Sequence, residues 1–436
     1  MSKNDKLFMP KKVYSEKMYM KGVYVEGSEK FRVVTREDAE KSEHRSVVVP
    51  LEYGSIYVVT FPNKTDRLRT AVIDTDPRKM KVGDTAVYTV GERFRAAYFE
   101  GEPGEFEGLL YTTERKGQFM VLYTSDKENI PVNIERIPVL LGHDTDDEWY
   151  KPGKQKDLKG NKNSWGKWDW TAEEVMEHVY EPLRKKNPDY ITRRDIGRDQ
   201  SGKYTMWAYF FEPKKYEQTL FITGGIHARE MDGYLGLARF IELMVNEDGS
   251  NKGLHYLRTK VRIILIPIVN VYSASEKHIR QNSRGVDLNR DFQFHTEGET
   301  INVIWLLHQY KDEVAALIDC HTCQTNKYDL YYNFSVQAPN CALCCRTTNH
   351  IYEDLKKRKL AKIPTVMSLV PGAYDKHDKY LQGYAWNRLG IPTLVCEHMH
   401  EHYAEEHSAL GLELAAEYYG NFIIQTALAK LKIIKK

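Results

Sequence analysis

A histidine and a glutamate three residues apart form the strongest local chemical signal in the sequence. His227 and Glu230 follow an apolar run and two glycines, and helix-type sequence comes directly after them. At such a junction both side chains can turn toward one point, and zinc readily accepts an imidazole nitrogen and a carboxylate oxygen. The pair alone also fits an ordinary helix start, where the helix dipole favours an acidic residue. It therefore indicates a metal site only if the chain supplies a third ligand.

His321 is the candidate for that third ligand. The apolar run 314–318 lies just before it, so a strand is expected to carry this histidine to its end. A lone histidine in such a place is more often a structural residue than a ligand. A catalytic zinc site needs three protein ligands and one open position, and His227, Glu230 and His321 would together supply the three.

Arginine and asparagine are concentrated between the two histidines. Three arginines and two asparagines lie within residues 280–290, and they include Arg280, Asn289 and Arg290. A guanidinium binds a carboxylate through a planar pair of donors, which a lysine cannot copy. A solvated charged loop is the plain alternative, but it does not explain why Asn289 and Arg290 follow an apolar Val-x-Leu pattern. The segment therefore predicts binding of a carboxylate or an oxyanion.

Glu397 stands at the end of another apolar run, residues 391–396. A carboxylate placed beside apolar residues is unfavourable unless it has a partner or a chemical role. Glu397 is therefore a further candidate for the chemistry.

In the order His-x-x-Glu, Arg, Asn-Arg, His, Glu, the chain resembles the zinc carboxypeptidase (funnelin) family. The runs His-Ala-Arg-Glu (227–230) and Gly-Val-Asp-Leu-Asn-Arg-Asp-Phe (285–292) are similar to the two signature blocks of that family. Several motifs in the right order are more specific than any one of them. The resemblance extends from about Trp168 to the C-terminus and leaves the first third of the chain uncovered.

The resemblance implies roles in metal binding and catalysis. His227, Glu230 and His321 would bind one zinc ion, with a water in the fourth position. Glu397 would be the general base that takes the proton of this water and passes it to the leaving amine. Arg280 would polarise the scissile carbonyl and stabilise the oxyanion.

The resemblance also implies roles in substrate binding. Asn289 and Arg290 would bind the free terminal carboxylate of a peptide, and Asp287 would orient the first zinc histidine. A mobile tyrosine should cover the substrate, and Tyr374 fits this position best, with Tyr380 as its rival. The preferred C-terminal side chain stays open.

The activity that this set implies is zinc-dependent hydrolysis of a C-terminal peptide bond. One alternative is a zinc amidohydrolase of the same fold that acts on N-acyl amino acids or on γ-glutamyl cell-wall peptides. A second alternative is a catalytically silent zinc-binding module. The silent module is disfavoured because Glu397 and Arg280 are both present.

The chain has three regions of different composition and periodicity, and these regions must position the candidate residues. Residues 1–141 contain short β-type runs between turn residues, among them residues 95–99, which predict an all-β, sandwich-like module whose role and partner stay open. Residues 142–167 are polar and rich in Gly and Lys, as in a linker. Residues 168–436 alternate helix-type and strand-type runs, which predict an α/β domain with a mixed, mostly parallel sheet flanked by helices. The expected helices include one that Thr171 and Glu174 begin as a capping box, one at about 232–244, and a long last helix at about 409–430. The resemblance makes this the catalytic domain.

Composition narrows the partners and the compartment. Lys and Arg number 63 against 61 Asp and Glu, a net charge of +2, so nucleic acid is not an expected partner. The N-terminus does not resemble a secretory signal, and no apolar run reaches bilayer length. We therefore expect no membrane partner and a cytoplasmic location, while export by a route without a cleaved signal stays open.

The six cysteines all lie in the C-terminal half of the chain. They are expected to be reduced thiols. A second metal site remains an alternative, and its ligands would come from Cys320, Cys323, Cys341, Cys344 and Cys345. The histidines 398, 400 and 402 after Glu397 are expected to form a solvated rim, with one histidine near the active site as the alternative.

Overall fold

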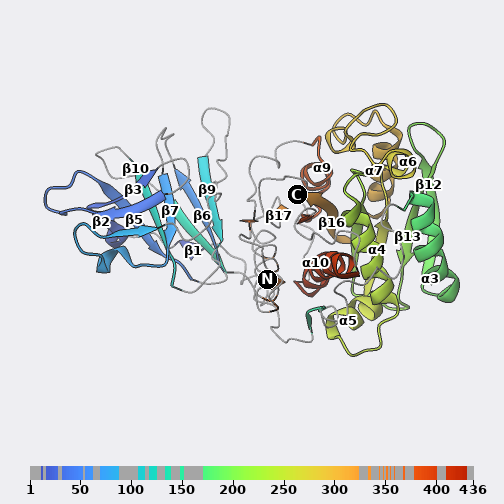
Figure 1. Cartoon of the computed structure of the whole chain (residues 1–436), viewed down its shortest axis with the longest axis horizontal. Helices are drawn as coiled ribbons and strands as arrows, with labels where there is room; N and C mark the ends of the chain where they lie inside the picture. The colour runs from blue at the N-terminus through green and yellow to red at the C-terminus, as the bar shows by residue number, and fades with distance from the viewer. Residues whose placement is uncertain are drawn as a thin grey trace. The chain divides into compact units, whose positions relative to one another are not determined.

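The computed structural model divides the chain into two units, an N-terminal unit up to residue 141 and a C-terminal unit from residue 142 onward (Figure 1). The two units are described separately below. The residues that the structure describes are 11–12, 16–27, 32–52, 55–61, 69–87, 107–112, 117–124, 133–138, 148–151, 170–323, 332–334, 343, 347, 350–351, 354, 358, 367–368, 378–399 and 409–429.

The N-terminal unit contains antiparallel sheets, in the strand orders β1-β11-β6-β9, β2-β5-β10-β7 and β3-β4-β8. The strands are β1 (Lys11–Lys12), β2 (Tyr19–Lys21), β3 (Val23–Gly27), β4 (Arg32–Arg36), β5 (Arg45–Pro50), β6 (Ser55–Phe61), β7 (Arg69–Ile73), β8 (Thr85–Val87), β9 (Glu107–Thr112), β10 (Phe119–Thr124) and β11 (Asn133–Pro138). Two 3₁₀ turns accompany them, η1 (Glu16–Met18) and η2 (Pro77–Lys79).

Among the described residues, one buried core of the N-terminal unit lies between its second and third sheets. Val25 and Val34 of the small sheet pack with Val48 and Val121 of the larger one, and all four are buried. Inward-facing β-branched residues of this kind are what a sandwich requires. The prediction of an all-β module is therefore confirmed for the described residues. The predicted strand at residues 95–99 lies outside them.

The C-terminal unit is built on an eight-stranded mixed sheet in the order β12-β13-β15-β14-β16-β19-β17-β18. Its strands are β12 (Ile191–Arg198), β13 (Thr205–Phe211), β14 (Gln218–Gly224), β15 (Val261–Ile266), β16 (Val314–Cys323), β17 (Tyr332–Phe334), β18 (Met367–Ser368) and β19 (Thr393–Met399). The four central strands β15, β14, β16 and β19 are parallel. The predicted mixed, mostly parallel sheet is thus confirmed.

Helices flank this sheet (Figure 1). They are α2 (Ala172–Val175), the π-helical turn η4 (Met176–Tyr180), α3 (Glu181–Lys186), α4 (Met231–Val245), α5 (Lys252–Lys260), α6 (Val271–Glu276), the 3₁₀ turn η5 (Leu288–Arg290), α7 (Gly298–Tyr310), α9 (Leu381–Leu389) and α10 (Ala409–Ala429). The predicted capping box is present, because Thr171 Oγ1 accepts from the Glu174 amide and Glu174 Oε2 accepts from the Thr171 amide. Helices α4 and α10 pack on each other and on β16 and β19.

Residues 148–151 are the described part of the predicted linker, and they are tied to the C-terminal unit. The Tyr150 amide donates to Asn421 Oδ1 at 2.8 Å, and Asn421 Nδ2 donates back to the Tyr150 carbonyl at 2.9 Å. Asn251 Nδ2 donates to the Trp149 carbonyl at 2.9 Å. This short segment therefore packs as part of the C-terminal unit.

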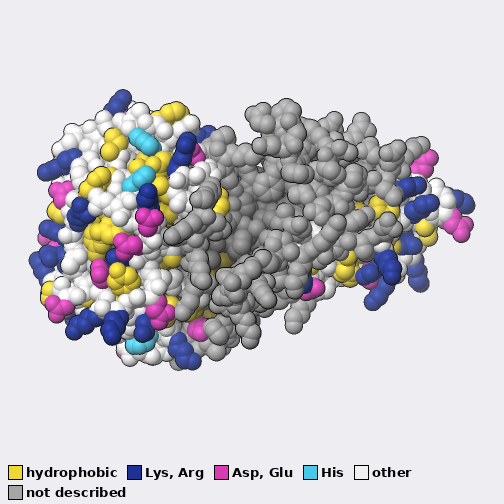
Figure 2. All heavy atoms as spheres, turned by 180° about the vertical axis from the view of Figure 1, so that it is seen from behind, with side chains coloured by type: hydrophobic (Ala, Val, Ile, Leu, Met, Phe, Trp, Pro, Cys, Tyr) yellow, Lys and Arg dark blue, Asp and Glu magenta, His cyan; other side chains and the backbone are white. Residues whose placement is uncertain are grey.

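The described surface carries mixed charge. On the face drawn in Figure 2, Lys and Arg side chains are interspersed with Asp and Glu over the described part of the molecule. Within the same described parts, none of the helices has the length and apolar character that crossing a bilayer requires.

Candidate active site

Two glycines at the end of β14 determine how the chain enters the site. A Cβ on Gly224 would lie 2.7 Å from the Pro267 carbonyl oxygen, and Gly225 has a φ of +61°. Without strain, only glycine can occupy a position with so close a contact, or a position with such a positive φ. The chain can therefore turn sharply here and place His227 and Glu230 in the short loop before α4.

Close packing of α4 then brings this loop to β16. A Cβ on Gly233 would lie 3.0 Å from the Cys320 carbonyl oxygen, so a larger residue there would push helix and strand apart. Glu230 lies one residue before α4, and His321 follows Cys320 on β16. The small contact at Gly233 thus allows Glu230 to reach His321.

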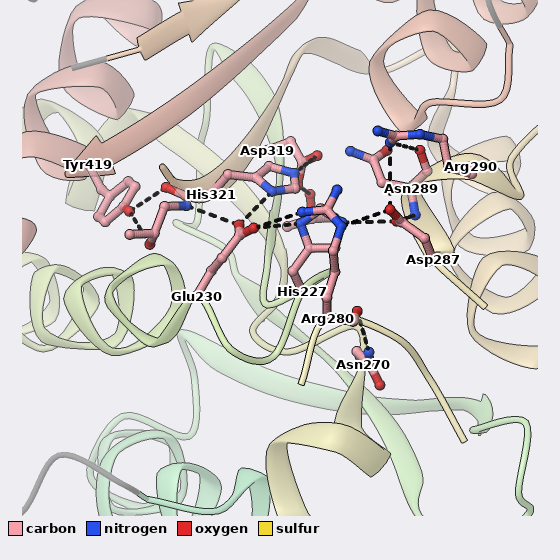
Figure 3. Close-up of polar contacts among 12 residues, drawn as sticks. His227, Glu230, Asn270, Arg280, Asp287, Asn289, Arg290, Asp319, His321 and Tyr419 are labelled. Atoms are coloured by element: carbon pink, nitrogen blue, oxygen red, sulfur yellow. Dashed lines mark hydrogen bonds and ion pairs between the residues drawn. The ribbon is translucent and has the colours of Figure 1, made fainter. Parts of the chain in front are cut away.

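The three predicted metal ligands converge on one point (Figure 3). Glu230 lies between the two rings: its Oε1 is 2.8 Å from Nδ1 of His227, and its Oε2 is 2.9 Å from Nδ1 of His321. The candidate ligand atoms lie within 4.8 Å of one another, and the three residues are 3%, 4% and 3% exposed. Two imidazole nitrogens and a carboxylate are a donor set that zinc prefers.

A separate carboxylate orients each histidine. His227 Nε2 is 3.0 Å from Asp287 Oδ1, and His321 Nε2 is 2.8 Å from Asp319 Oδ2. Both nitrogens of each ring face a carboxylate, because Glu230 lies beside the two Nδ1 atoms. The hydrogen bond from Nε2 to its own carboxylate fixes each ring, so loss of the Nδ1 proton would make Nδ1 a ligand atom for a metal ion. The site therefore fits zinc in the orientation of its donors as well as in their identity.

Electrostatics keep the metal-facing carboxylate ionised. Burial raises the pKa of Glu230, but the charges of His227 and His321 outweigh it, so this pKa lies well below its ordinary value. Burial likewise raises the pKa of Asp287, while its contacts to His227 and Arg280 lower it further than burial raises it. Both groups are thus anionic at neutral pH, the form in which a carboxylate binds or supports a cation.

Arg280 reaches the same carboxylates from the loop after α6. Its Nε donates to Asp287 Oδ2 at 2.8 Å, and its Nη1 donates to Glu230 Oε1 at 3.3 Å. Among the described residues its Nη2 has no partner, so this nitrogen can still donate to a ligand. The structure therefore places Arg280 at the metal site, next to two of the predicted functional residues.

Glu397 comes to the site on β19. It is in register with His321 on the neighbouring parallel strand β16, so the two side chains lie on the same face of the sheet. Burial is the main reason that its pKa rises to about 7, and Glu230 adds to the rise, while His321, His227 and Arg280 oppose it. The pairing with His321 therefore places Glu397 beside the triad.

Asn289 and Arg290 lie in the 3₁₀ turn η5, which Asp287 caps through a hydrogen bond to the Asn289 amide. Asn289 Oδ1 accepts from the Leu381 amide at 3.1 Å. An amide donor needs an acceptor, so this contact identifies the oxygen of the Asn289 carboxamide. Its Nδ2 has no partner among the described residues, so it is able to donate to a ligand.

Other predicted residues have different outcomes. Tyr374 lies outside the described residues, whereas its rival Tyr380 is buried with its ring against Arg290. His398 does not belong to a solvated rim as expected: it is 1% exposed, and its Nδ1 lies 3.3 Å from Asp232 Oδ2. The rim prediction is wrong for His398 because side chains alternate along a strand, so the neighbour of Glu397 faces the opposite side, toward α10.

Only some of the candidate ligands of the alternative second metal site lie among the described residues. Cys320 is buried and free, and the side chains of Cys323, Cys341, Cys344 and Cys345 lie outside the described residues. Within the described part of the chain, the triad is the one cluster whose His, Cys, Asp and Glu side chains could hold a metal ion.

The sequence interpretation missed three residues that support the site. Asp319 orients His321, Thr223 Oγ1 donates to Asp319 Oδ1 at 2.7 Å, and Tyr419 OH donates to the His321 carbonyl at 2.6 Å. A signal for Asp319 existed, because residues two apart on a strand share a face and Asp-x-His therefore brings the two side chains together. Tyr419 is 98 residues from His321 and has no local signal.

Several solved structures are similar to this chain. A metallo-carboxypeptidase from Burkholderia cenocepacia matches over 76% of this chain and 81% of its own, at 12% identity and a TM-score of 0.46. Carboxypeptidase A from Helicoverpa armigera matches over 60% and 74%, at 14% identity and a TM-score of 0.48. A metallo-carboxypeptidase from Pseudomonas aeruginosa matches over 94% and 87%, at 11% identity and a TM-score of 0.45. No curated protein matches the chain in sequence.

One protein-family model matches the C-terminal unit. Residues 176–337 match the family described as zinc carboxypeptidase, Peptidase M14. The matched segment contains His227, Glu230 and His321, and it ends before Glu397, which comes to the site through the pairing of β19 with β16. The C-terminal unit thus combines a segment that matches the zinc carboxypeptidase (Peptidase M14) family with a His-Glu-His triad consistent with zinc binding.

Proposed function

We propose that the C-terminal unit is a zinc metallocarboxypeptidase, which hydrolyses the peptide bond next to a free C-terminal carboxylate. The observation that carries this proposal is the position of Glu397, in register with His321 and under the electrostatic influence of the whole triad. A carboxylate with a pKa raised toward neutrality, beside a metal-binding triad, suits a general base. The match to this family implies peptides as the substrate class.

Glu397 is assigned the proton transfers. As a carboxylate it takes one proton from the attacking water while the oxygen of that water bonds to the scissile carbon. The same group then gives the proton to the amine nitrogen as the carbon–nitrogen bond breaks, so it returns to its starting state. Zinc, when it is bound by the triad, supplies Lewis-acid polarisation and lowers the pKa of water.

Arg280 is assigned to the developing oxyanion. Its Nε and Nη1 are held by Asp287 and Glu230, which fixes the plane of the guanidinium. The remaining Nη2 can donate to the carbonyl oxygen as negative charge builds on it. A donor held in place beforehand needs little reorganisation during the reaction, which is what makes such donors effective.

Asn289 and Arg290 are assigned to the substrate carboxylate. The Nδ2 of Asn289 is the free end of its carboxamide, because Oδ1 accepts from Leu381. Arg290 uses one Nη1 donor on the Asn289 carbonyl at 2.8 Å and retains further in-plane donors. A carboxamide N–H and a guanidinium edge side by side can bind both oxygens of one carboxylate.

The proposal is tested with a panel of blocked dipeptides, each as the free acid and as the C-terminal amide, together with zinc analysis of the protein. The zinc-loaded protein should release the C-terminal residue from the free acids. Glu397→Gln should lower kcat by about 100-fold or more and leave bound zinc unchanged. Arg290→Ala should raise KM for the free acids and hardly change hydrolysis of the amides.

Other outcomes separate the alternatives. Hydrolysis confined to N-acyl amino acids or γ-glutamyl peptides would replace the peptidase proposal with the amidohydrolase. Equal loss of zinc and activity in Glu397→Gln would give this residue a structural role. Zinc binding without hydrolysis of any substrate would indicate a silent module.

A further inference from the structure

The Arg290 guanidinium lies against the ring of Tyr380. The central carbon of this guanidinium is 4.5 Å from the ring centroid, well within the range of a cation–π contact. The Arg290 side chain is 41% exposed, whereas Tyr380 is 7% exposed. The arginine is therefore supported on one face by a buried ring and remains partly exposed to solvent.

The other contacts of Arg290 do not hold its guanidinium plane. Its Nη1 is 3.9 Å from Asp287 Oδ2, beyond hydrogen-bond range, and that oxygen accepts from Arg280 Nε at 2.8 Å. Among the described residues, the one hydrogen bond of the side chain is from Nη1 to the neighbouring Asn289 carbonyl. A single bond to the preceding residue leaves rotation about the long arginine side chain open, so the ring face supplies the missing restraint.

The backbone around Tyr380 is itself fixed to the Asn289–Arg290 segment. The Phe292 amide donates to the Lys379 carbonyl at 3.1 Å, and the Leu381 amide donates to Asn289 Oδ1 at 3.1 Å. These two bonds lie on either side of Tyr380 in sequence. The ring therefore stays with Arg290, and the same contacts align the Asn289 carboxamide with it.

We infer that Tyr380 is a positioning residue, whose ring face holds the Arg290 guanidinium in the plane that receives the substrate carboxylate. This inference rests on the proposed carboxypeptidase function. A cation–π contact uses the face of the guanidinium and leaves its N–H donors, which point along the plane, available for a carboxylate. Tyr380 acts through its ring in this role, and its hydroxyl is not required.

The ring and the hydroxyl are separated by two variants. Tyr380→Leu should raise KM for free-acid dipeptides by roughly 3- to 30-fold with little change in kcat, the range that cation–π contacts cover. Tyr380→Phe keeps the ring and should stay within about twofold of the native protein. Equilibrium binding of N-acetyl amino acids, as free acids and as amides, should show the same pattern for the acids only.

Two controls distinguish positioning from a general loss of structure. Tyr384→Leu removes a ring one turn further along α9, where it contacts His295 and His308 instead of Arg290, and it should leave KM unchanged. In an Arg290→Ala background, Tyr380→Leu should cause no further loss, because its effect passes through the guanidinium.

The inference would be overturned if Tyr380→Phe weakened binding of the free acids as much as Tyr380→Leu does, or if Tyr380→Leu left that binding unchanged. It would also be overturned if Tyr380→Leu weakened binding in the Arg290→Ala background as much as it does in the native protein. Failure of the proposed function gives a different result, since a protein that binds the N-acetyl acids but hydrolyses nothing would still show the Tyr380 effect in the binding assay. A native protein without affinity for the free acids would overturn the role of Tyr380 as well.

Discussion

Asp319 offers the sharpest test of how the metal site is built. Its side chain is fully buried, with one oxygen on His321 Nε2 at 2.8 Å and the other on Thr223 Oγ1 at 2.7 Å. If it orients the ring and fixes its tautomer, then Asp319→Ala should weaken zinc binding without removing a ligand. It should also leave His321 Nε2 as a buried donor with no acceptor.

The size of the effect follows from these two contacts. Loss of a carboxylate that orients a ligating histidine typically weakens metal binding by about 10- to 100-fold, or about 1.4 to 2.7 kcal/mol. For Asp319→Asn the loss of zinc affinity should lie near the lower end of this range, because the new amide oxygen can still accept from Nε2 while the amide nitrogen donates to Thr223. Thr223→Val should weaken binding less than either, since the contact from Asp319 to His321 remains.

The assay is competition for zinc against a chelator of known affinity, with circular dichroism to verify that each variant is folded. Asp287→Ala is the matched control at the other histidine, because Asp287 contacts His227 Nε2 at 3.0 Å in the same way. It should weaken zinc binding to a similar degree. An Asp319→Ala protein that binds zinc as tightly as the native chain would refute the orienting role.

The remaining predictions concern pH and backbone strain. Burial raises the pKa of Glu299 to about 7 from an ordinary 4.5, so this group favours the fold below about pH 4.5 and that stability is lost as pH rises through 7. Glu299→Gln should therefore raise the free energy of unfolding above neutral pH by up to about 3 kcal/mol and change it little at about pH 4. Urea unfolding at the two pH values measures this, and a difference between variant and native protein that does not depend on pH would contradict it. Burial raises the pKa of Glu397 to about 7, so kcat/KM should fall at low pH as this base is protonated. Bound zinc should place the decrease of kcat/KM between about pH 4.5 and 7. A kcat/KM that does not change with pH over this range would exclude Glu397 as the base. Gly225→Ala should cost about 1 to 2 kcal/mol in thermal unfolding and weaken zinc binding, because φ is +61° and the new Cβ would lie 3.1 Å from Ile268. Gly249→Ala, with a φ of +83° and no atom closer than 4.0 Å to the new Cβ, should show the strain without the effect on zinc binding.

The elements that carry the chemistry could be predicted because their signals are local. The apolar run 314–318 became β16, the run ending before Glu397 became β19, and the predicted helix 232–244 is α4 to within a residue at each end. Residues 409–430 were expected to form the last helix, and α10 spans Ala409–Ala429. In each case periodicity and length determine the type of element without reference to distant residues.

Contacts between distant segments were beyond the reach of these signals. Tyr419 on α10 supports the His321 carbonyl, and the ring of Tyr380 supports Arg290, yet neither pairing leaves a local pattern. The sheet order was equally inaccessible, because the periodicity of a strand does not say which strand is its neighbour. Only Asp319, two residues before His321, could have been recognised from spacing.

The register between β16 and β19 brings His321 and Glu397 together in one site. His321 pairs with Glu397 and Thr322 with His398, so a shift of one residue would turn Glu397 to the other face and bring a neighbour into its place. Contacts on the far face oppose that shift: His398 lies 3.3 Å from Asp232, and Tyr419 is bonded to the His321 carbonyl. Because Asp232 is two residues after Glu230 on the same loop and helix start, the contact that holds His398 in place also ties β19 to the element that carries the metal-binding carboxylate. The position of the proposed base and the geometry of the triad are thus set by one group of packed side chains, and a change at His398 should disturb both together.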